Sequence, residues 1–153
     1  MVLVATIRRD GSPRLNPVEP LFWRGDLWLL MGWESRKVGD LARDSRVLVH
    51  SVAAHRDGSD GEVKLRGRAV PETEPAIQVP VAAEVVERLG WRPEIGKFHL
   101  FRVDVEDITV LRWDDPTNTQ YVTRWPDGTE YVRRGTSATS LGPPEPSPDP
   151  LLE

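Results

Sequence analysis

Polar and apolar residues alternate with a period of two along residues 62–70, EVKLRGRAV. Such alternation is typical of a β-strand with one buried face. The polar face carries four charged side chains in succession, so it is either solvated or turned towards a ligand. Arg66 and Arg68, on this face, are either solvated cations or a supplement to an anion site.

Several other short segments have β-type composition and are separated by turn signals. Turn sequences stand at Asp10-Gly11, Arg24-Gly25-Asp26 and Pro126-Asp127-Gly128. The first three segments are predicted to form an antiparallel meander, and the prolines of the second make it an edge strand or a bulged one. The predicted strands span residues 2–8, 15–23, 27–33, 47–54 and 98–113, followed by a hairpin over 120–134.

Two segments favour helices. Ser35 is a good N-cap, and an apolar stripe with spacing i, i+3, i+4 follows it as far as Asp44. Residues 73–90 also have a helical pattern, in which Pro80 is predicted to start the main part and Gly90 to end it. Their apolar side is formed by Val81, Val85, Val86 and Leu89.

These patterns predict a mainly β fold with two helices. Six to eight antiparallel strands in about 135 residues favour a small barrel, because closure removes exposed strand edges. We expect one domain over residues 1–135. Residues 136–153, TSATSLGPPEPSPDPLLE, are rich in Pro and Ser and poor in large apolar groups, so this tail is predicted to be disordered.

Composition excludes several kinds of site. The chain has no cysteine, and its three histidines lie far apart, so no metal site is expected. No apolar run approaches the roughly 20 residues needed to cross a bilayer, which favours a soluble, cytoplasmic protein without a membrane partner. The net charge of −4 makes nucleic acid an unexpected partner.

The segment Ser35-Arg36-Lys37 places two cations at the start of a predicted helix. Cations there oppose the helix dipole, at a cost of about a few tenths of a kcal/mol each. Together with free backbone N–H groups and a hydroxyl, they would form a phosphate cradle. The alternative is solvated surface charge, with or without an ion pair to Glu34 or Asp40.

The order of these features resembles the pyridoxamine 5′-phosphate oxidase-like split-barrel flavoproteins. The likeness is carried by the segments ATIRRDGSPRLNPV, DLWLLMG, SRKVGDLARDSRVLVHS and VKLRGRAV. It covers about residues 3–70, and more loosely the strand at 98–113 and the segment 124–134. The resemblance implies a small antiparallel split β-barrel that forms a homodimer, with a flavin in each of two clefts between the subunits.

The resemblance also implies which residues bind the cofactor. It assigns the flavin phosphate to Ser35, Arg36 and Lys37. It places a second set of residues near the flavin ring, namely Arg14, Asn16, Pro17 and Val18. An edge strand with outward polar residues and no ligand accounts for their pattern equally well. The resemblance further places His50 and Ser51 where they would reach the ribityl chain or the phosphate, unless His50 has a structural role.

The sequence departs from the vitamin-B6 oxidases of this group. Their basic residues on the second strand and a Tyr-Thr pair on the third are replaced here by LNPVEP and by Leu30-Met31. Vitamin-B6 oxidation is therefore not expected. The resemblance instead favours the branch that binds FMN or, alternatively, a deazaflavin coenzyme.

The expected function is that of an FMN-dependent oxidoreductase acting on a small molecule. The alternatives are a deazaflavin-dependent reductase and a non-catalytic carrier or sensor of flavin or haem. No side chain is identified as a catalytic acid or base, since the flavin itself carries hydride transfer. Trp28 and Trp33 are expected in the core or in a cleft wall. Trp113 and Trp125 either pack in the core or cover the flavin ring across the dimer.

Overall fold

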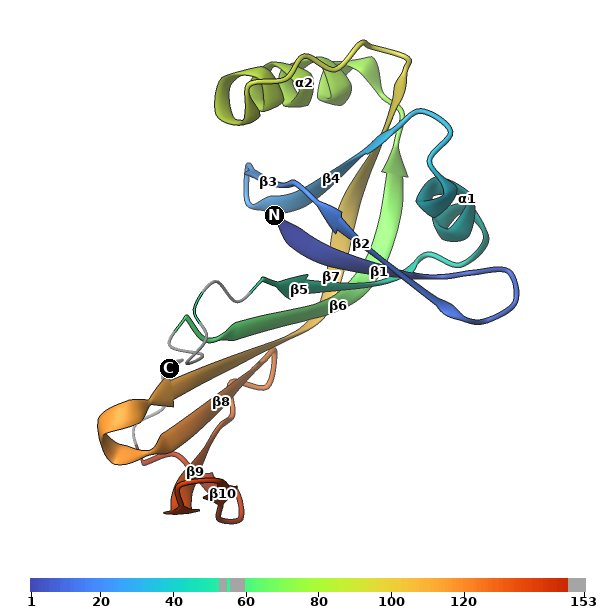
Figure 1. The fold of residues 1–153 in the computed structure, drawn as a ribbon. Coiled ribbons are helices and arrows are strands. Elements are labelled where there is room, and N and C mark those ends of the chain that lie inside the picture. The colour runs from blue at the N-terminus through green and yellow to red at the C-terminus, as the bar shows by residue number, and fades with distance from the viewer. Residues whose placement is uncertain (53–54, 56–59, 149–153) are drawn as a thin grey trace. The chain divides into compact units, whose positions relative to one another are not determined.

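The computed structural model describes residues 1–52, 55 and 60–148. As the sequence predicted, this part of the chain is mainly antiparallel β-structure with two α-helices (Figure 1). A single 3-10 turn, Asp115–Thr117, follows the longest strand. The elements in chain order are β1 (Val2–Ile7), β2 (Pro13–Val18), β3 (Pro20–Trp23), β4 (Asp26–Gly32), α1 (Arg36–Arg43), β5 (Arg46–Ser51), β6 (Glu62–Glu72), α2 (Pro75–Leu89), β7 (Phe98–Asp114), β8 (Thr119–Trp125), β9 (Glu130–Ser137), β10 (Ser140–Leu141) and β11 (Glu145–Pro146).

The strands are joined in the order β10-β9-β8-β7-β6-β5-β1-β2, while β4 pairs with both β3 and β7. Residues cluster in two compact units. Unit 1 comprises Met1–Val49 and Gly67–Val105, and unit 2 comprises His50–Arg66 and Glu106–Glu153. Because β5, β6 and β7 contribute residues to both units, this clustering does not test the expectation of one domain over residues 1–135, which stays a prediction.

The core of unit 1 lies between α2 and the strands β3, β4 and β7. Val81 and Val85 of α2 are fully buried there, together with Leu21 and Leu100. Trp28 is only 4% exposed in this cluster, and its indole N–H donates to the Trp23 carbonyl at 3.2 Å. The expectation that Trp28 lies in the core is therefore correct.

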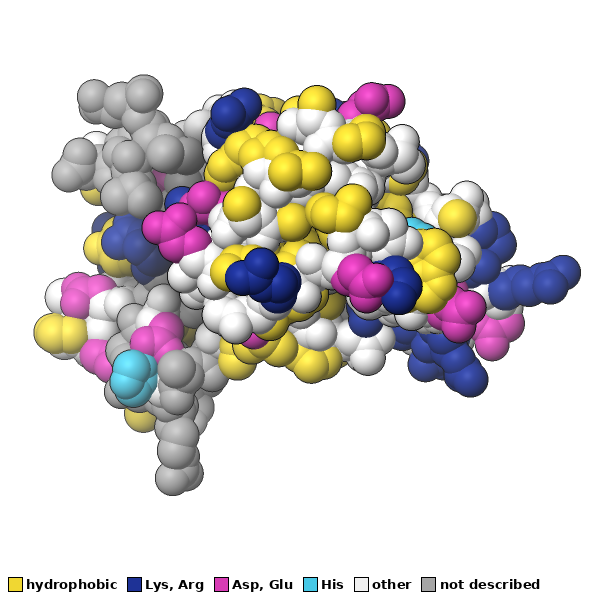
Figure 2. Space-filling model, turned by 90° about the horizontal axis from the view of Figure 1, so that it is seen from above, with side chains coloured by type: hydrophobic (Ala, Val, Ile, Leu, Met, Phe, Trp, Pro, Cys, Tyr) yellow, Lys and Arg dark blue, Asp and Glu magenta, His cyan; other side chains and the backbone are white. Residues whose placement is uncertain are grey.

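The helix α2 lies within the predicted segment 73–90, but its main part does not start at Pro80. It starts at Pro75, so that Pro80 lies inside it rather than at the start of its main part. A proline suits the first position of a helix, where no N–H bond is lost, and the sequence pattern did not distinguish between the two prolines. Gly90 ends the helix in the left-handed region at φ 74°, as predicted. The outer side of α2 is also apolar, with Val79 53% exposed (Figure 2).

The proline-containing segment 15–23 is interrupted. β2 ends at Val18 and β3 begins at Pro20, so that β1 pairs with β2, and β3 pairs with β4. β2 stands at the end of the strand order. Both observations agree with the prediction that its prolines place this segment at an edge or a bulge.

Unit 2 is built on the hairpin of β8 and β9, which packs beside the end of β7. The Arg124 N–H donates to the Thr129 carbonyl at 2.8 Å and closes the hairpin at the predicted turn. Glu130 is buried, and its carboxylate accepts hydrogen bonds from Thr123 at 2.5 Å and from Arg112 at 3.2 Å. Burial acts to raise the pKa of Glu130, but these hydrogen bonds and the charge of Arg112 hold it below the usual value.

The structure differs from the predicted disordered tail over residues 136–148. Two short strands in this segment, β10 and β11, pair with β9. The Ser147 N–H also donates to the Glu130 carbonyl at 2.8 Å. These contacts are backbone hydrogen bonds, which a prediction from apolar content does not detect. Residues 149–153, and residues 53–54 of the predicted strand 47–54, lie outside the described residues.

Gly67 marks a close approach of two backbones in unit 1. A Cβ atom at this position would lie 2.2 Å from the carbonyl oxygen of Asp104 on β7. Real Cβ contacts are never this short, so any larger residue would push β6 away from β7. Gly67 is thus required for the pairing of these two strands.

We predict that Gly67→Ala lowers the free energy of unfolding by about 1–3 kcal/mol, the usual effect of forcing extra volume into a packed site. The matched control is Gly39→Ala in α1, where an added Cβ meets no atom within 4 Å. This control is expected to raise stability by about 0.5–1 kcal/mol, because glycine weakens a helix interior. Urea denaturation measures both variants, and equal stabilities would contradict the assignment.

Candidate functional site

The turn between β4 and α1 carries the Ser-Arg-Lys segment. The Ser35 N–H donates to the Gly32 carbonyl at 3.1 Å, and the Ser35 carbonyl accepts from the Val38 N–H at 2.9 Å. Glu34, which lies between Gly32 and Ser35 in the chain, adopts a left-handed backbone conformation with φ 59°. For a residue with a side chain this conformation costs about 1–2 kcal/mol. Backbone strain of this kind is concentrated at functional sites.

The first turn of α1 has the electrostatic character of an anion site. It contains no acidic residue, and the Ser35 side chain makes no capping hydrogen bond. Among the described residues, no carboxylate pairs with Arg36 or Lys37. The optional ion pair of the sequence-based alternative is therefore not formed in the described part of the chain, and Asp40 is engaged by other arginines. Solvated surface charge stays the alternative, since Arg36 is exposed and Lys37 half-buried. The N–H groups, the hydroxyl and the two cations together suit a phosphate.

The position of α1 is fixed by the buried carboxylate of Asp40. Asp40 is 5% exposed and accepts a hydrogen bond from the Thr6 hydroxyl of β1 at 2.9 Å. It also accepts from Arg14 Nε of β2 at 2.6 Å and from Arg43 of its own helix at 3.2 Å. Arg43 in turn donates to the Ile7 carbonyl at 2.7 Å. The helix is thereby tied to both strands of the β1–β2 hairpin.

The surroundings of Asp40 determine its charge. Burial acts to raise its pKa, but the hydrogen bonds from Arg14, Thr6 and Arg43 and the charge of Arg14 hold the pKa below the usual value. The carboxylate is thus ionised at neutral pH. This permanent negative charge on α1 keeps Arg14 and Arg43 in place beside the β1–β2 hairpin.

The residues predicted beside the flavin ring lie on β2, next to this anchor. Arg14, Asn16 and Val18 point to the inner face of the strand, and Pro17 lies on the outer face. Arg14 is engaged in the ion pair with Asp40, so its evident role is to position α1. A contact between any of these four residues and a cofactor stays a prediction.

His50 and Ser51 belong to unit 2, where both support the pairing of β5 with β6. The Ser51 hydroxyl accepts from the Val63 N–H at 2.9 Å, and His50 Nε2 lies 3.6 Å from a carboxylate oxygen of Glu62. Arg66 on β6 donates to the carboxylate of Asp107 at 2.6 Å. These contacts are structural, and the predicted approach of His50 and Ser51 to a cofactor stays a prediction.

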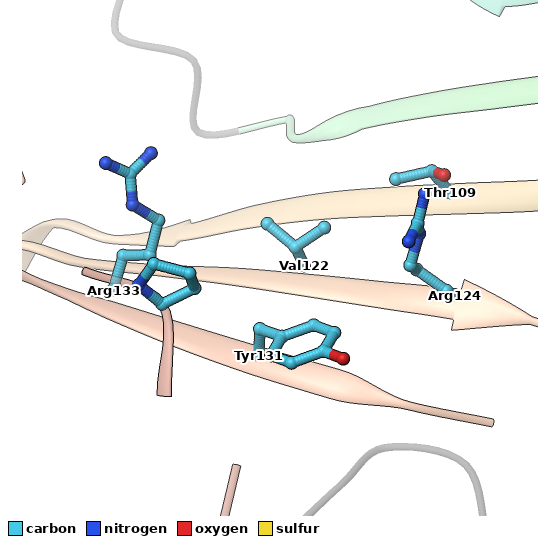
Figure 3. Close-up of a pocket in the computed structure, with 6 residues that line it drawn as sticks. Thr109, Val122, Arg124, Tyr131 and Arg133 are labelled. Carbon is cyan, nitrogen blue, oxygen red and sulfur yellow. The ribbon is translucent and has the colours of Figure 1, made fainter. Parts of the chain in front are cut away.

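Two hollows are lined by arginines. In unit 1, a hollow of about 490 Å³ is lined by Arg8, Arg9, Asp10, Arg14 and Asp40, at the tip of the β1–β2 hairpin. In unit 2, a hollow of about 260 Å³ lies on the sheet of β7, β8 and β9. Figure 3 shows Arg124 and Arg133 at its two ends, with Val122 and Tyr131 between them.

The structure also bears on metal binding, membrane spans and the exposed tryptophans. Within residues 1–52, 55 and 60–148, no group of three or more His, Asp or Glu side chains could hold a metal ion. No helix in this part of the chain is long and apolar enough to cross a membrane. Trp33 is 56% exposed and is not a core residue, while Trp125 is 44% exposed.

Sequence reasoning missed two important features of the site. It considered Asp40 only as a partner of the helix cations, because Thr6 and Arg14 are distant in the chain. It also gave no sign of the strained backbone at Glu34, for which no residue pattern is diagnostic.

Comparison with known proteins identifies the family. The sequence profile described as pyridoxamine 5′-phosphate oxidase matches residues 1–112. The chain belongs to the pyridoxamine 5′-phosphate oxidase family. The Ser-Arg-Lys turn, Asp40 and the β1–β2 hairpin all lie inside the region that matches this family, whereas β8 to β11 lie outside it. No curated protein sequence matches the chain.

Solved structures support the same fold for this chain. A conserved hypothetical protein from Mycobacterium tuberculosis is 24% identical with a TM-score of 0.62, over 70% of this chain and 73% of that one. General Stress Protein 26 from Bacillus anthracis is 19% identical, with a TM-score of 0.57 over 71% and 81%. HutZ, the heme storage protein from Vibrio cholerae, is 18% identical, with a TM-score of 0.59 over 71% and 84%. The fold is the antiparallel split barrel of the pyridoxamine 5′-phosphate oxidase family, as the sequence predicted.

We predict that Asp40→Asn lowers the free energy of unfolding by about 3 kcal/mol at neutral pH, because two arginines lose a buried partner. The pKa of Asp40 is lower in the folded chain, so this stabilisation is complete above the ordinary aspartate pKa. It is lost as the pH falls through the folded value. Denaturation of both proteins between neutral and acid pH tests this. A stability difference that does not shrink in acid would contradict the assignment.

Proposed function

We propose that this chain binds FMN and acts as a flavin-dependent oxidoreductase on a small molecule. The observation that carries the proposal is the pair of cations, Arg36 and Lys37, at the strained start of α1 without a carboxylate partner among the described residues. In a member of the pyridoxamine 5′-phosphate oxidase family, a phosphate is the ligand that best accounts for this arrangement.

The residues present fit the phosphate of FMN. The backbone N–H groups of the first turn of α1, the Ser35 hydroxyl and the side chains of Arg36 and Lys37 would hold the dianion. The anchored carboxylate of Asp40 would keep these groups aligned with β2, whose Asn16 is the candidate partner of the ring edge. A bound flavin supplies the hydride chemistry, whereas the protein binds and orients it.

We also propose that the chain is a homodimer. The outer face of the sheet formed by β6, β5, β1 and β2 in unit 1 carries exposed apolar side chains, next to Arg46 of β5 and Arg68 of β6, which lie on the same faces of their strands. Leu15 on β2 is 58% exposed, and Leu48 on β5 and Val70 on β6 are each 38% exposed. A contiguous exposed apolar patch is typical of an interaction surface, and we propose that these side chains form part of one. A second copy of the chain would cover it and complete a cofactor cleft at the interface.

Two alternatives use the same cleft. A deazaflavin coenzyme could replace FMN, and the protein could carry or sense flavin or haem without turnover. HutZ, a structural neighbour, is described as a heme storage protein. The absorption spectrum of the purified protein separates flavin, deazaflavin and haem. Turnover of the bound flavin with a nicotinamide donor separates an enzyme from a carrier.

We predict that Lys37→Ala weakens FMN binding about 10- to 150-fold, the range for losing a hydrogen bond to a charged group. Titration of the apoprotein with FMN, followed by flavin fluorescence, measures the change. A parallel titration with the deazaflavin coenzyme shows which cofactor is preferred.

The control is Lys97→Ala, which removes the other lysine of unit 1. Lys97 pairs with Glu94 at 2.8 Å and lies outside the α1 turn. The FMN dissociation constant of this variant is expected to equal that of the wild type. Equal affinity in the Lys37→Ala variant would refute the cradle.

We predict that Leu48→Glu converts the dimer into a monomer, because a charge would be buried in the apolar interface. Light scattering at micromolar concentration measures the mass. Val79→Glu places the same charge on the exposed side of α2 and is expected to leave the dimer intact. A monomeric wild type would argue against a shared cleft.

A further inference from the structure

Unit 1 contains another hollow, of about 260 Å³, between the end of β6, the first turns of α2 and the start of β7. It uses none of the residues of the Ser-Arg-Lys segment. Its floor is apolar, since the neighbouring Phe98 and Leu100 are buried in the core. The side chains that give it chemical character are Trp33, Glu72, Thr73, Gln78 and His99.

One wall of the hollow is a stacked pair of aromatic rings. The rings of Trp33 and His99 lie parallel, with an angle of 6° between their planes and 5.0 Å between their centres. Trp33 remains 56% exposed. A large aromatic side chain held flat against a second ring but left open on the hollow offers a stacking surface to a planar molecule.

Two polar side chains of the hollow offer free hydrogen-bond acceptors. Gln78 donates its amide N–H to the Glu72 carbonyl at 2.8 Å, which leaves its amide oxygen to accept. One carboxylate oxygen of Glu72 accepts from the Glu74 N–H at 2.8 Å, and the other is available. No lysine or arginine is among the described residues that line the hollow.

These observations define the ligand by its shape and charge. A planar ring fits the aromatic wall, N–H donors fit the free acceptors, and a positive charge fits both the carboxylate and the face of an indole. An anion would meet the charge of Glu72 with no cation to offset it. The volume equals about nine water molecules at about 30 Å³ each, which suits one ring with a small substituent.

We propose that this hollow is a binding site for a small planar nitrogen heterocycle, neutral or cationic, which stacks on Trp33 and donates hydrogen bonds to Glu72 and Gln78. The site is separate from the phosphate cradle and does not rest on the proposed function. It explains why a tryptophan next to the turn before α1 stands open rather than packing into the core.

Three pyridine probes of similar size and different charge test the proposal. They are 1-methylnicotinamide, which is cationic, nicotinamide, which is neutral, and nicotinate, which is anionic and lacks the amide donor. Each is titrated into the full chain, and the indole N–H signal of Trp33 is followed by nuclear magnetic resonance after assignment with Trp33→Phe. We expect saturable shifts for the first two probes, with the cation bound at least as tightly, and affinity at least tenfold weaker for nicotinate.

Variants identify the groups that bind. Trp33→Ala is expected to reduce the affinity for nicotinamide at least tenfold, and Trp33→Phe to retain most of it. Glu72→Gln is expected to remove the preference for the cation while leaving nicotinamide binding. Because Trp33→Ala removes the reporting signal, binding to it is read from the signals of the ligand.

The controls separate this site from the cradle and from general loss of structure. Trp91→Ala removes another exposed tryptophan of unit 1 and is expected to leave binding unchanged, as is Lys37→Ala. Backbone amide spectra show whether each variant keeps the native fold. Equal affinity for all three probes, unchanged affinity in a folded Trp33→Ala variant, or loss of ring binding in Lys37→Ala would overturn the proposal.

Discussion

The candidate cofactor site depends on the hydrogen bonds and ion pairs that the buried carboxylate of Asp40 makes. A charge in this position is tolerated only because Thr6, Arg14 and Arg43 surround it with hydrogen bonds. The cost of separating the charge from its partners holds α1 in one position against the β1–β2 hairpin. The direction in which the first turn of α1 points is therefore set by a residue one turn further along the helix.

This anchor allows the start of α1 to be locally unfavourable. A helix of eight residues is too short to be stable alone. Its N-terminus carries cations that oppose the helix dipole. Glu34, which precedes the helix, has a strained backbone conformation. Contacts at Asp40 and the buried Leu41 offset these local terms. An anion at the first turn would remove part of the remaining repulsion, so cofactor binding and the stability of α1 are expected to be coupled.

The sequence was informative where the determining pattern is local. Alternation along residues 62–70, the turn signals and the helix start after Ser35 each depend on a few neighbouring residues. The structure agrees with them, although the Ser35 side chain makes no capping hydrogen bond. The sequence was uninformative where the partners are distant. Asp40 meets Thr6 and Arg14 across 34 and 26 residues, and the stacking of Trp33 on His99 joins residues even further apart. The strands of the predicted disordered tail likewise depend on an edge offered by β9.

The turn before α1 separates two regions of opposite electrostatic preference. Trp33, on one side of Glu34, belongs to a hollow that contains the carboxylate of Glu72 and, among the described residues that line it, no lysine or arginine. Ser35, on the other side, begins a turn whose groups donate hydrogen bonds or carry positive charge. A dianion bound at the turn and a neutral or cationic ring bound in the hollow, as we propose for each, would therefore not compete for the same groups. Under these two proposals, occupation of one region would leave the charges of the other free.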